Sequence, residues 1–551
     1  MDALTFALRS SKGIKLCYGP PQSGPCDAFP AVQNPNCRDM SFSSDGSSFS
    51  WCANQGASVV ECKNFGTLSL INQPGIAYVK FSPKGTYLST WTPYKVKENQ
   101  HASCNLHIYD VKTGECKKSF IQKKQTGWYP QWSDDEKICA RNVNDVHFFE
   151  DADFSTMKKK ISMQKIANFA LAPGSAPYHV VCFVPGLRGQ PSFVRMFKYP
   201  NFEGSGAIIA QRSFFKAERT DFYWNKTGKD CIFLTSVDVD KSGMSYYGEL
   251  NLYYASVKGE TAKIILAKSG PVYSVQWSPD STQFCVVFGF MPAKATVFNL
   301  KCEPVLDFEG APRNEVRLIE VWDLKLKKQI SNFKSQDSTV IQWSYDGEYI
   351  LTATTSPRLR IGNGYRIWHY TGSLLAEVFL PSNEELYDIK WKPVPEGAYS
   401  VKPTTFTPVA GIKSALPEAS KQVYRPPGAQ GKQSTFKLHD EESKKNETAA
   451  PNTLTKYQRK HLARKARKEQ EKSAGSTEIS EKSEPVEMAY TAELTGDPEK
   501  DKKIRNIVKK LNQIDKLKQD QAAGKPLQPS QLEKMQKFDQ LEAELESLQI
   551  K

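Results

Sequence analysis

The sequence lacks several features that would assign it to common classes of protein. It has no run close to the roughly 18 consecutive apolar residues that a membrane-spanning helix needs, and Met1–Ser10 contains no long apolar core after a basic start. None of its 12 cysteines forms a C-x-x-C pair. Such isolated cysteines are usually buried small side chains in a reducing compartment. We therefore expect a cytoplasmic protein with no membrane span and no zinc or other metal site.

The motifs of common catalytic sites are also absent. The Gly-Lys pairs that begin at Gly228, Gly431 and Gly524 lack the upstream glycine and the following Ser or Thr of a nucleotide-binding P-loop. The sequence contains no G-x-S-x-G and no H-E-x-x-H. The 7 histidines are scattered, and none is paired at helical ligand spacing. We expect no enzymatic activity and no cofactor.

Tryptophan and cysteine are confined to the first part of the chain. All 10 Trp lie between Trp51 and Trp391, and all 12 Cys lie between Cys17 and Cys302. The formal charge is +14, with 45 Lys+Arg against 38 Asp+Glu in residues 1–400 and 29 against 22 in residues 401–551. The composition therefore separates a core-forming part from a more densely basic tail. The basic excess favours a polyanion such as RNA, or serves solubility alone.

One phrase recurs through the first 400 residues: an aromatic or large apolar residue, a small polar residue, and a turn rich in Pro, Asp and Gly. A short apolar run follows each copy, so the phrase predicts a hairpin of two strands. Its copies begin at Phe42, Phe81, Trp132, Leu171, Trp224, Trp277, Trp343 and, in truncated form, Trp391. A second phrase alternates with it, a short strand of β-branched and aromatic residues such as Leu106–Asp110.

The spacing of the second phrase predicts an all-β propeller. Its copies lie mostly about 40 to 57 residues apart, and a strand-only repeat of about 40 to 50 residues is typical of propeller blades. We predict a WD40-like propeller of about nine blades over residues 1–400. Because Trp391 lacks later strands and Ile14–Tyr18 lacks an opening strand, we expect one blade to combine both ends of this region.

One repeat is too short. Only about 23 residues separate Thr296–Phe298 from Ile319–Asp323, and Leu306–Leu318 contains no copy of the aromatic turn phrase. We predict that this blade has lost its first hairpin, so that it is incomplete and exposes strand edges and neighbouring faces. A divergent blade built from short irregular segments is the alternative.

The tail is predicted to alternate linkers and helices. Residues 401–455 and 473–496 are low in large apolar residues and predict disordered or low-complexity linkers. Residues 456–472 favour a basic helix, whose cations would neutralise RNA phosphates in a salt-dependent way. A nuclear import signal or a solvated helix is the alternative. The predicted nucleic-acid-binding residues are Lys456, Arg459, Lys460, Arg464, Lys465, Arg467 and Lys468.

Residues 497–551 predict a helical hairpin or coiled coil. Two apolar stripes recur at three- and four-residue spacing, separated by Gly524–Pro526, and Ser530 with Glu533 forms a capping box for the second helix. Two narrow stripes bury each other only partly, so a leftover face for a partner is predicted; a self-contained hairpin is equally compatible. The predicted partner-binding residues are Ile504, Ile507, Leu511, Ile514, Leu532, Met535, Leu541 and Leu545.

Several segments resemble the eukaryotic translation initiation factor 2A family. Gly289–Ala295, Asn363–Gly372, Tyr424–Pro427 and Gly496–Glu499 carry the resemblance, which covers nearly the whole chain. It implies a nine-bladed propeller with a helical tail. It also implies a factor that directs initiator methionyl-tRNA to the small (40S) ribosomal subunit in a codon-dependent, GTP-independent way for a subset of mRNAs. The implied partners are that subunit, the tRNA, mRNA and other initiation factors.

The chain departs from this family pattern between Asn314 and Leu318, where the resemblance implies a further hairpin. The sequence also leaves a second function open. In that alternative the propeller is a scaffold that joins protein partners on the ribosome or another ribonucleoprotein, without direct tRNA binding.

Overall fold

The chain divides into two compact units, residues 1–423 and residues 424–551. The computed structural model describes residues 3–95 and 103–415, except 164, 187–189, 205, 216, 238–247, 310–317, 336 and 401, together with scattered positions between 504 and 543. Within these ranges no helix has the length and apolar character that crossing a bilayer requires.

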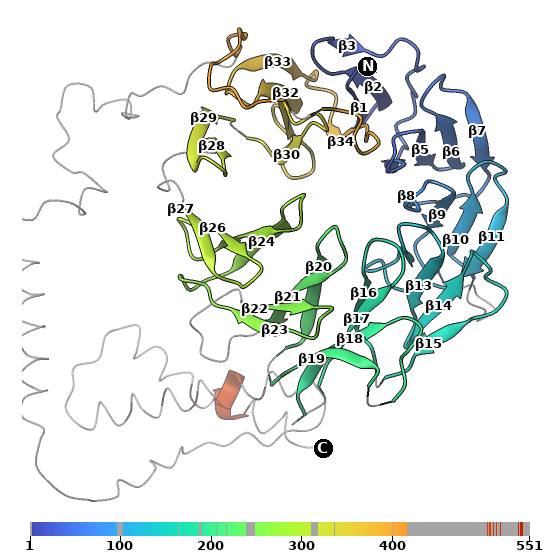
Figure 1. The fold of residues 1–551 in the computed structure, drawn as a ribbon, viewed down its shortest axis with the longest axis vertical. Helices are drawn as coiled ribbons and strands as arrows, with labels where there is room; N and C mark the ends of the chain where they lie inside the picture. Colours follow the sequence, from blue (N-terminus) through green and yellow to red (C-terminus); the bar gives the residue numbers. More distant parts are fainter. Residues whose placement is uncertain are drawn as a thin grey trace, which may run out of the picture. The chain divides into compact units, whose positions relative to one another are not determined.

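The described residues of the first unit form a ring of nine antiparallel sheets (Figure 1), eight with four strands and one with two. The first half of the strands, in chain order, are β1 (Thr5–Ser10), β2 (Gly13–Tyr18), β3 (Gly24–Pro25), β4 (Asp39–Phe42), β5 (Ser48–Ala53), β6 (Gly56–Glu61), β7 (Thr67–Ile71), β8 (Tyr78–Phe81), β9 (Tyr87–Trp91), β10 (Leu106–Asp110), β11 (Cys116–Phe120), β12 (Gln131–Trp132), β13 (Ile138–Asn142), β14 (Val146–Glu150), β15 (Lys159–Ile161), β16 (Asn168–Leu171) and β17 (His179–Val184).

The remaining strands are β18 (Ser192–Lys198), β19 (Ile208–Phe214), β20 (Arg219–Trp224), β21 (Asp230–Val237), β22 (Glu249–Ser256), β23 (Thr261–Ile264), β24 (Val272–Trp277), β25 (Gln283–Phe288), β26 (Lys294–Asn299), β27 (Pro304–Glu309), β28 (Leu318–Asp323), β29 (Lys328–Lys334), β30 (Val340–Trp343), β31 (Tyr349–Thr354), β32 (Gly364–His369), β33 (Leu374–Phe379) and β34 (Leu386–Trp391). Among the described residues, seven of the nine sheets each consist of four consecutive strands, and the first of the four lies nearest the centre of the ring (Figure 1). The other two are the closing sheet, which joins β34 to β1–β3, and the two-stranded sheet β28–β29. The prediction of an all-β propeller is confirmed.

The ring closes through a sheet made from both ends of the propeller. Strand order in this sheet is β3–β2–β1–β34, and Phe6 of β1 pairs with Trp391 of β34. Ser10 Oγ donates to Glu384 Oε1 at 2.6 Å, and Lys12 forms an ion pair with the same carboxylate at 3.2 Å. The predicted shared blade is therefore present.

The serine of the recurring phrase explains why that phrase forms a hairpin. Ser43 Oγ donates to Asp45 Oδ1 at 2.6 Å and accepts from the backbone N–H of Ser48 at 2.9 Å. The side chain thus joins the turn to the start of the second strand, and Gly46 takes the positive φ of 69° that the turn requires. Ser278 repeats this arrangement with Asp280 and Gln283.

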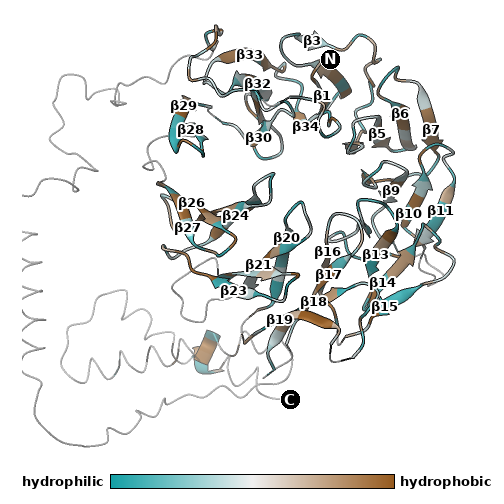
Figure 2. Cartoon of the chain, viewed as in Figure 1, coloured by the Kyte–Doolittle hydropathy of each residue, from teal (hydrophilic) through white to brown (hydrophobic). Residues whose placement is uncertain are grey.

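The core consists of separate apolar clusters between neighbouring sheets. Phe148 of β14 and Val180 of β17, both fully buried, belong to one such cluster. Alternate side chains on each strand point to opposite faces, so each central strand contributes to the clusters on both of its sides. The strands differ in polarity: Figure 2 colours β15 as hydrophilic and β18 largely as hydrophobic.

Side chains of the innermost strands also form hydrogen bonds with the backbone of the innermost strand in the blade before or after their own. The bonds across the junctions include Val79 N to Asp39 Oδ2 (3.0 Å), Gln131 Nε2 to Phe169 O (3.0 Å), Asn168 Nδ2 to Thr220 O (2.7 Å), Trp277 Nε1 to Tyr223 O (2.8 Å), Gln342 Nε2 to Ile389 O (3.1 Å) and Lys390 Nζ to Met40 O (2.9 Å). A polar ring of contacts therefore lines the centre of the propeller.

The two-stranded sheet β28–β29 is the incomplete blade, and we call it the half blade. It contributes Val321 and Phe333 to an apolar cluster with Ile350 and Trp368 of the following blade. On its other side β25 of the preceding blade alternates between buried residues and the half-buried Gln283, Cys285 and Val287, whereas every residue of β17 is buried. The predicted loss of a hairpin is confirmed, and it leaves one face of β25 partly uncovered.

Residues 402–415 correct the predicted boundary at residue 400. This segment was assigned to the disordered linker of residues 401–455, yet it lies along the blade β30–β33. Ile412 N donates to Leu374 O at 2.7 Å, Ser373 Oγ donates to Val409 O at 2.7 Å, and Ala415 N donates to Glu377 Oε2 at 2.6 Å. Backbone hydrogen bonds, which composition does not encode, hold the segment there; the rest of that linker lies outside the described residues.

Glu377 anchors the end of this segment to the blade. Its carboxylate lies 2.7 Å from Arg366 Nε in an ion pair whose side chains are 4% and 9% exposed, and it accepts from Ser414 Oγ at 2.8 Å. Burial opposes ionisation, but the hydrogen bonds from Arg366, Ala415 and Ser414 outweigh it and lower the pKa of Glu377. The ionised form is therefore the stabilising one.

We expect Glu377→Gln to lower the free energy of unfolding by about 2 kcal/mol at pH 7, because a charge-assisted hydrogen bond is lost at a buried site. A carboxyl whose pKa is lower in the folded state stabilises the fold fully above its unfolded pKa of about 4.3. This stabilisation is lost as the pH falls through the lower pKa of the folded state. The difference between the natural chain and the variant should thus shrink below about pH 4.3. Urea unfolding at pH 7 and pH 3.5 measures it; a difference that does not depend on pH would contradict this assignment.

The second unit has its described apolar residues in helices. Positions 504, 506–508, 511, 514 and 518 are helical, as are 538 and 540–543. Ile504, Ile507 and Leu511 are at most 4% exposed and pack against Phe538 and Leu541. Lys518 Nζ lies 3.2 Å from the centre of the Phe538 ring. These contacts agree with two helices that pack on each other.

Candidate functional site

The binding residues predicted from the sequence fall in the second unit. The cationic positions Lys456–Lys468 lie outside the described residues, as do Leu532, Met535 and Leu545. Ile504, Ile507, Leu511 and Ile514 are buried, and Leu541 is half-buried. Their burial favours the self-contained hairpin that the sequence left open, and their role in binding a partner stays a prediction.

A cavity of about 660 Å³ opens among the innermost strands of four neighbouring blades. Its walls come from β4, β8, β30 and β34, from residues just after β30 and β34, and from Trp128 between β11 and β12, so parts of the chain more than 300 residues apart meet there. The lining residues are Asp39, Met40, Ser41, Phe42, Tyr78, Val79, Lys80, Trp128, Gln342, Trp343, Tyr345, Lys390, Trp391 and Pro393.

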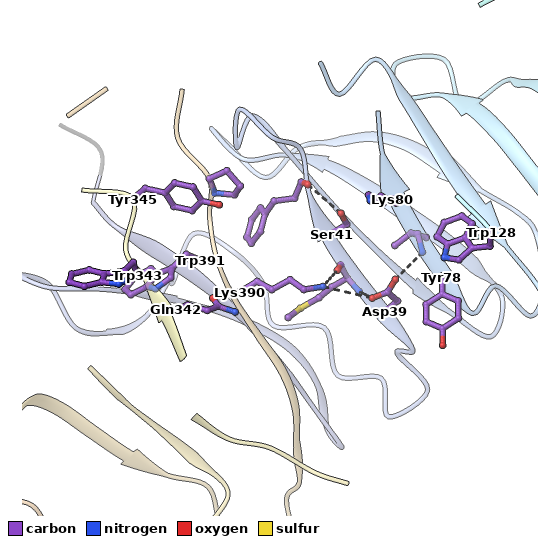
Figure 3. Close-up of a pocket in the computed structure, with 14 residues that line it drawn as sticks. Asp39, Ser41, Tyr78, Lys80, Trp128, Gln342, Trp343, Tyr345, Lys390 and Trp391 are labelled. Carbon is purple, nitrogen blue, oxygen red and sulfur yellow. Dashed lines mark hydrogen bonds and ion pairs between the residues drawn. The ribbon is translucent and has the colours of Figure 1, made fainter. Parts of the chain in front are cut away.

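The polar side chains of the cavity lie between two groups of aromatic rings. Figure 3 shows Trp343, Tyr345 and Trp391 at one end, Tyr78 and Trp128 at the other, and Lys390 and Asp39 between them. Tyr78 and Trp128 stack with ring centres 6.1 Å apart and an angle of 23°. The cavity is therefore elongated, with flat apolar surfaces at both ends.

Asp39 and Lys390 neutralise each other. Lys390 Nζ lies 4.0 Å from Asp39 Oδ1, 3.0 Å from Asp388 Oδ2 and 2.9 Å from the carbonyl oxygen of Met40. Asp39 also accepts hydrogen bonds from the backbone N–H of Val79 at 3.0 Å and of Met40 at 2.9 Å. Burial raises the pKa of Asp39, and the Lys390 charge opposes that rise. These two residues hold the cavity wall in place.

Lys80 is the cation without an acidic partner. Its Nζ lies 4.2 Å from the centre of the Tyr129 ring, and no carboxylate among the described residues forms an ion pair with it. The side chain is exposed along the wall of the cavity, yet the protein atoms around it and the charge of Lys390 lower its pKa. An anion beside Lys80 would favour the charged form of the ammonium group and so oppose both effects.

Trp343 is exposed because the half blade next to it has no inner strand among the described residues. The tryptophans that begin the same phrase in two complete blades donate to the inner strand of the preceding blade: Trp224 to Ala170 O at 3.3 Å and Trp277 to Tyr223 O at 2.8 Å. The half blade offers no such strand in the described part of the chain. Trp343 is consequently 51% exposed and Tyr345 50% exposed.

Sequence reasoning identified the phrases that contain these residues but not the cavity. The aromatic positions Trp343 and Trp391 were assigned to structural hairpins, and Lys80 and Lys390 were not selected. The signal that was available was the lysine one residue before an aromatic residue on two inner strands, Lys80-Phe81 and Lys390-Trp391. This pattern does not show which blades are neighbours in the ring, and the cavity depends on that order.

Comparisons with known proteins agree with this architecture. The family described as eukaryotic translation initiation factor eIF2A matches residues 212–319 and 317–389, and the eukaryotic translation initiation factor 2A C-terminal domain matches residues 502–548. The first match is thus interrupted at the start of the half blade, where the hairpin is missing. A crystal structure titled as that of the eukaryotic initiation factor is 30% identical, with a TM-score of 0.65, over 72% of this chain and 100% of its own.

Relatives that match over nearly their whole length carry the same family name. Eukaryotic translation initiation factor 2A from Drosophila melanogaster is 33% identical over 99% of this chain and 98% of its own length. The proteins of that name from Caenorhabditis elegans and Schizosaccharomyces pombe are each 31% identical, over 100% and 98% of both chains respectively.

The ring of antiparallel sheets defines a WD-type propeller protein, and the two family matches assign it to the translation initiation factors. Identity above 30% over nearly the whole length of both chains then decides the particular family. The chain belongs to the eukaryotic translation initiation factor 2A family.

Proposed function

We propose that this translation initiation factor directs initiator methionyl-tRNA to the small (40S) ribosomal subunit, in a codon-dependent, GTP-independent way and for a subset of mRNAs. It acts in the cytoplasm, together with mRNA and other initiation factors. The observation that carries the proposal is the near full-length similarity to proteins named eukaryotic translation initiation factor 2A.

The charge distribution supports contact with RNA. Residues 401–551 contain 29 Lys+Arg against 22 Asp+Glu, and Lys456–Lys468 contains seven of these cations and no acid. Such a segment releases counterions when it binds phosphates, which gives affinity that falls steeply with salt. In the proposed function the basic segment binds tRNA or ribosomal RNA, and the propeller provides further surfaces for the subunit.

Replacing the seven Lys and Arg of residues 456–468 by Gln is expected to weaken binding to purified small subunits that carry initiator tRNA. The slope of log affinity against log salt should fall by up to about 5, because each lost contact with single-stranded RNA contributes about 0.7. Filter binding between 50 and 300 mM salt measures this. A matched control carries Gln at an equal number of lysines between residues 502 and 537 and should keep the slope.

Crosslinking on the purified subunit separates this function from the scaffold alternative. The proposed function predicts crosslinks from the chain to initiator tRNA. Crosslinks to ribosomal proteins alone, with an unchanged salt slope in the Gln variant, would favour a scaffold that joins protein partners.

A further inference from the structure

We propose that the elongated cavity binds a short segment of single-stranded RNA, with bases stacked on the aromatic residues at its ends and a phosphate beside Lys80. The proposal rests on the proposed function, in which RNA is the ligand, and it adds a second RNA contact, on the propeller itself. It uses only described residues of the first unit.

The aromatic rings favour a polymer with flat units over a single small anion. Trp343 and Tyr345 expose about half of their surface at one end, and the stacked pair Tyr78 and Trp128 lies at the other. Aromatic residues alternating with cations are the usual surface for unpaired bases, because every base has a face that stacks regardless of sequence. The volume of about 660 Å³ lies within the range of sites that enclose a ligand of nucleotide size.

The charges of the cavity favour an anion over a basic peptide. Asp39 is already engaged by two backbone N–H groups and by Lys390, so it is not available to a cationic side chain. Lys80 has no carboxylate partner among the described residues. A lysine or arginine side chain of a peptide would therefore be repelled by the ammonium group of Lys80 and would find no free carboxylate in the cavity. A phosphate, by contrast, would pair with Lys80.

The wall of the cavity also holds a donor without a partner. The indole N–H of Trp391 is buried, and the side chain, 4% exposed, has no hydrogen-bond acceptor in the part of the chain that the structure describes. A buried donor of this kind is normally satisfied. Because this indole lies in the apolar cluster of the closing blade, contact with the RNA is left to Lys80 and the exposed rings.

The test uses fluorescein-labelled oligo(U) and oligo(A) of eight nucleotides with the full-length chain, both natural and with the Gln-substituted basic segment. The second background removes the contribution of residues 456–468. Trp343→Ala is expected to weaken binding about tenfold or more, as measured for single stacked bases. Lys80→Gln should weaken binding and lower the salt slope by about 0.7, while Lys80→Arg should retain both.

Matched controls lie away from the cavity. Phe215, 90% exposed after β19, replaced by Ala, and Lys301, exposed after β26, replaced by Gln, should leave affinity unchanged. The second measurement is photocrosslinking of 4-thiouridine RNA to the natural chain. Crosslinks should map to peptides containing Trp343, Tyr345 or Trp128, so that the proposal is testable even where a substitution disturbs folding.

Three results would overturn the proposal: equal affinity for all cavity variants, crosslinks confined to residues outside the cavity, or binding of a Lys- and Arg-rich peptide that depends on Trp343 while RNA binding does not. The proposed function fails on a different observation, the absence of initiator tRNA crosslinks on the small subunit. Each conclusion can therefore fail without the other.

Discussion

A chain whose half blade receives a new hairpin is expected to melt about 2 °C or more above the natural chain. The insertion is a copy of Val272–Phe288, the hairpin β24–β25, placed after Asn314. It would supply the two inner strands that β28 lacks on its unpaired side. Differential scanning fluorimetry at one scan rate measures the shift.

The expected gain comes from surfaces that the missing hairpin leaves uncovered. Ile341 is 57% exposed and Trp343 51% exposed, although equivalent positions in complete blades face a neighbouring sheet. Covering the exposed halves of these two side chains contributes about 2 kcal/mol, since full burial of one large apolar side chain contributes about 1.5–3 kcal/mol. Cys285 and Val287 on β25 add to this.

A Gly- and Ser-rich insertion of the same length is the control, because it lengthens the loop without forming strands. It should leave the melting temperature unchanged or slightly lower. Equal melting temperatures for the hairpin and the control insertion would mean that the exposed faces are already stable without a partner strand. Binding of a hydrophobic dye should fall in the hairpin variant alone.

Phe6→Ala is expected to lower the free energy of unfolding by about 3–5 kcal/mol, the usual range for removing a buried phenylalanine. Phe6 is fully buried at the closing blade, with ring centres 5.2 Å from Tyr365 and 5.3 Å from Trp391. It therefore joins the first strand, the last strand and the adjacent blade. The cavity left by Ala would weaken the contacts with Tyr365 and Trp391 at once.

Urea unfolding followed by tryptophan fluorescence measures this loss. Phe215→Ala removes the same side chain at a site that is 90% exposed, and it should change stability by less than about 0.5 kcal/mol. Similar unfolding midpoints for the two variants would show that closure does not depend on the Phe6 cluster.

Much of the propeller could be predicted from the sequence because its signals are local. The Ser-x-Asp turn forms within a few residues, as Ser43 with Asp45 shows, and repeats at blade spacing. The short repeat before Ile319 likewise predicted the half blade. By contrast, residues 402–415 look like a linker in composition, and their order depends on backbone partners in β33 that no local pattern reveals.

The cavity could not be predicted for a related reason. Its residues come from four inner strands, and Lys80 and Trp343 face a common space only through the order of the blades around the ring. The exposure of Trp343 is the effect of strands that are missing, which a search for motifs does not detect. The stripe of Ile504, Ile507 and Leu511 was visible in the sequence, and packing against a second helix was one of the arrangements that the sequence left open; the structure packs it against Phe538 and Leu541.

Because β1 pairs with β34, the ring cannot close until β34 has been synthesised. The N-terminal strand leaves the ribosome first, yet its partner, Leu386–Trp391, is made last among the strands. Until then β1 presents an unpaired edge to other chains. A product that terminates before Leu386 would thus hold most of its blades and still lack closure, which makes it a substrate for chaperones and proteases.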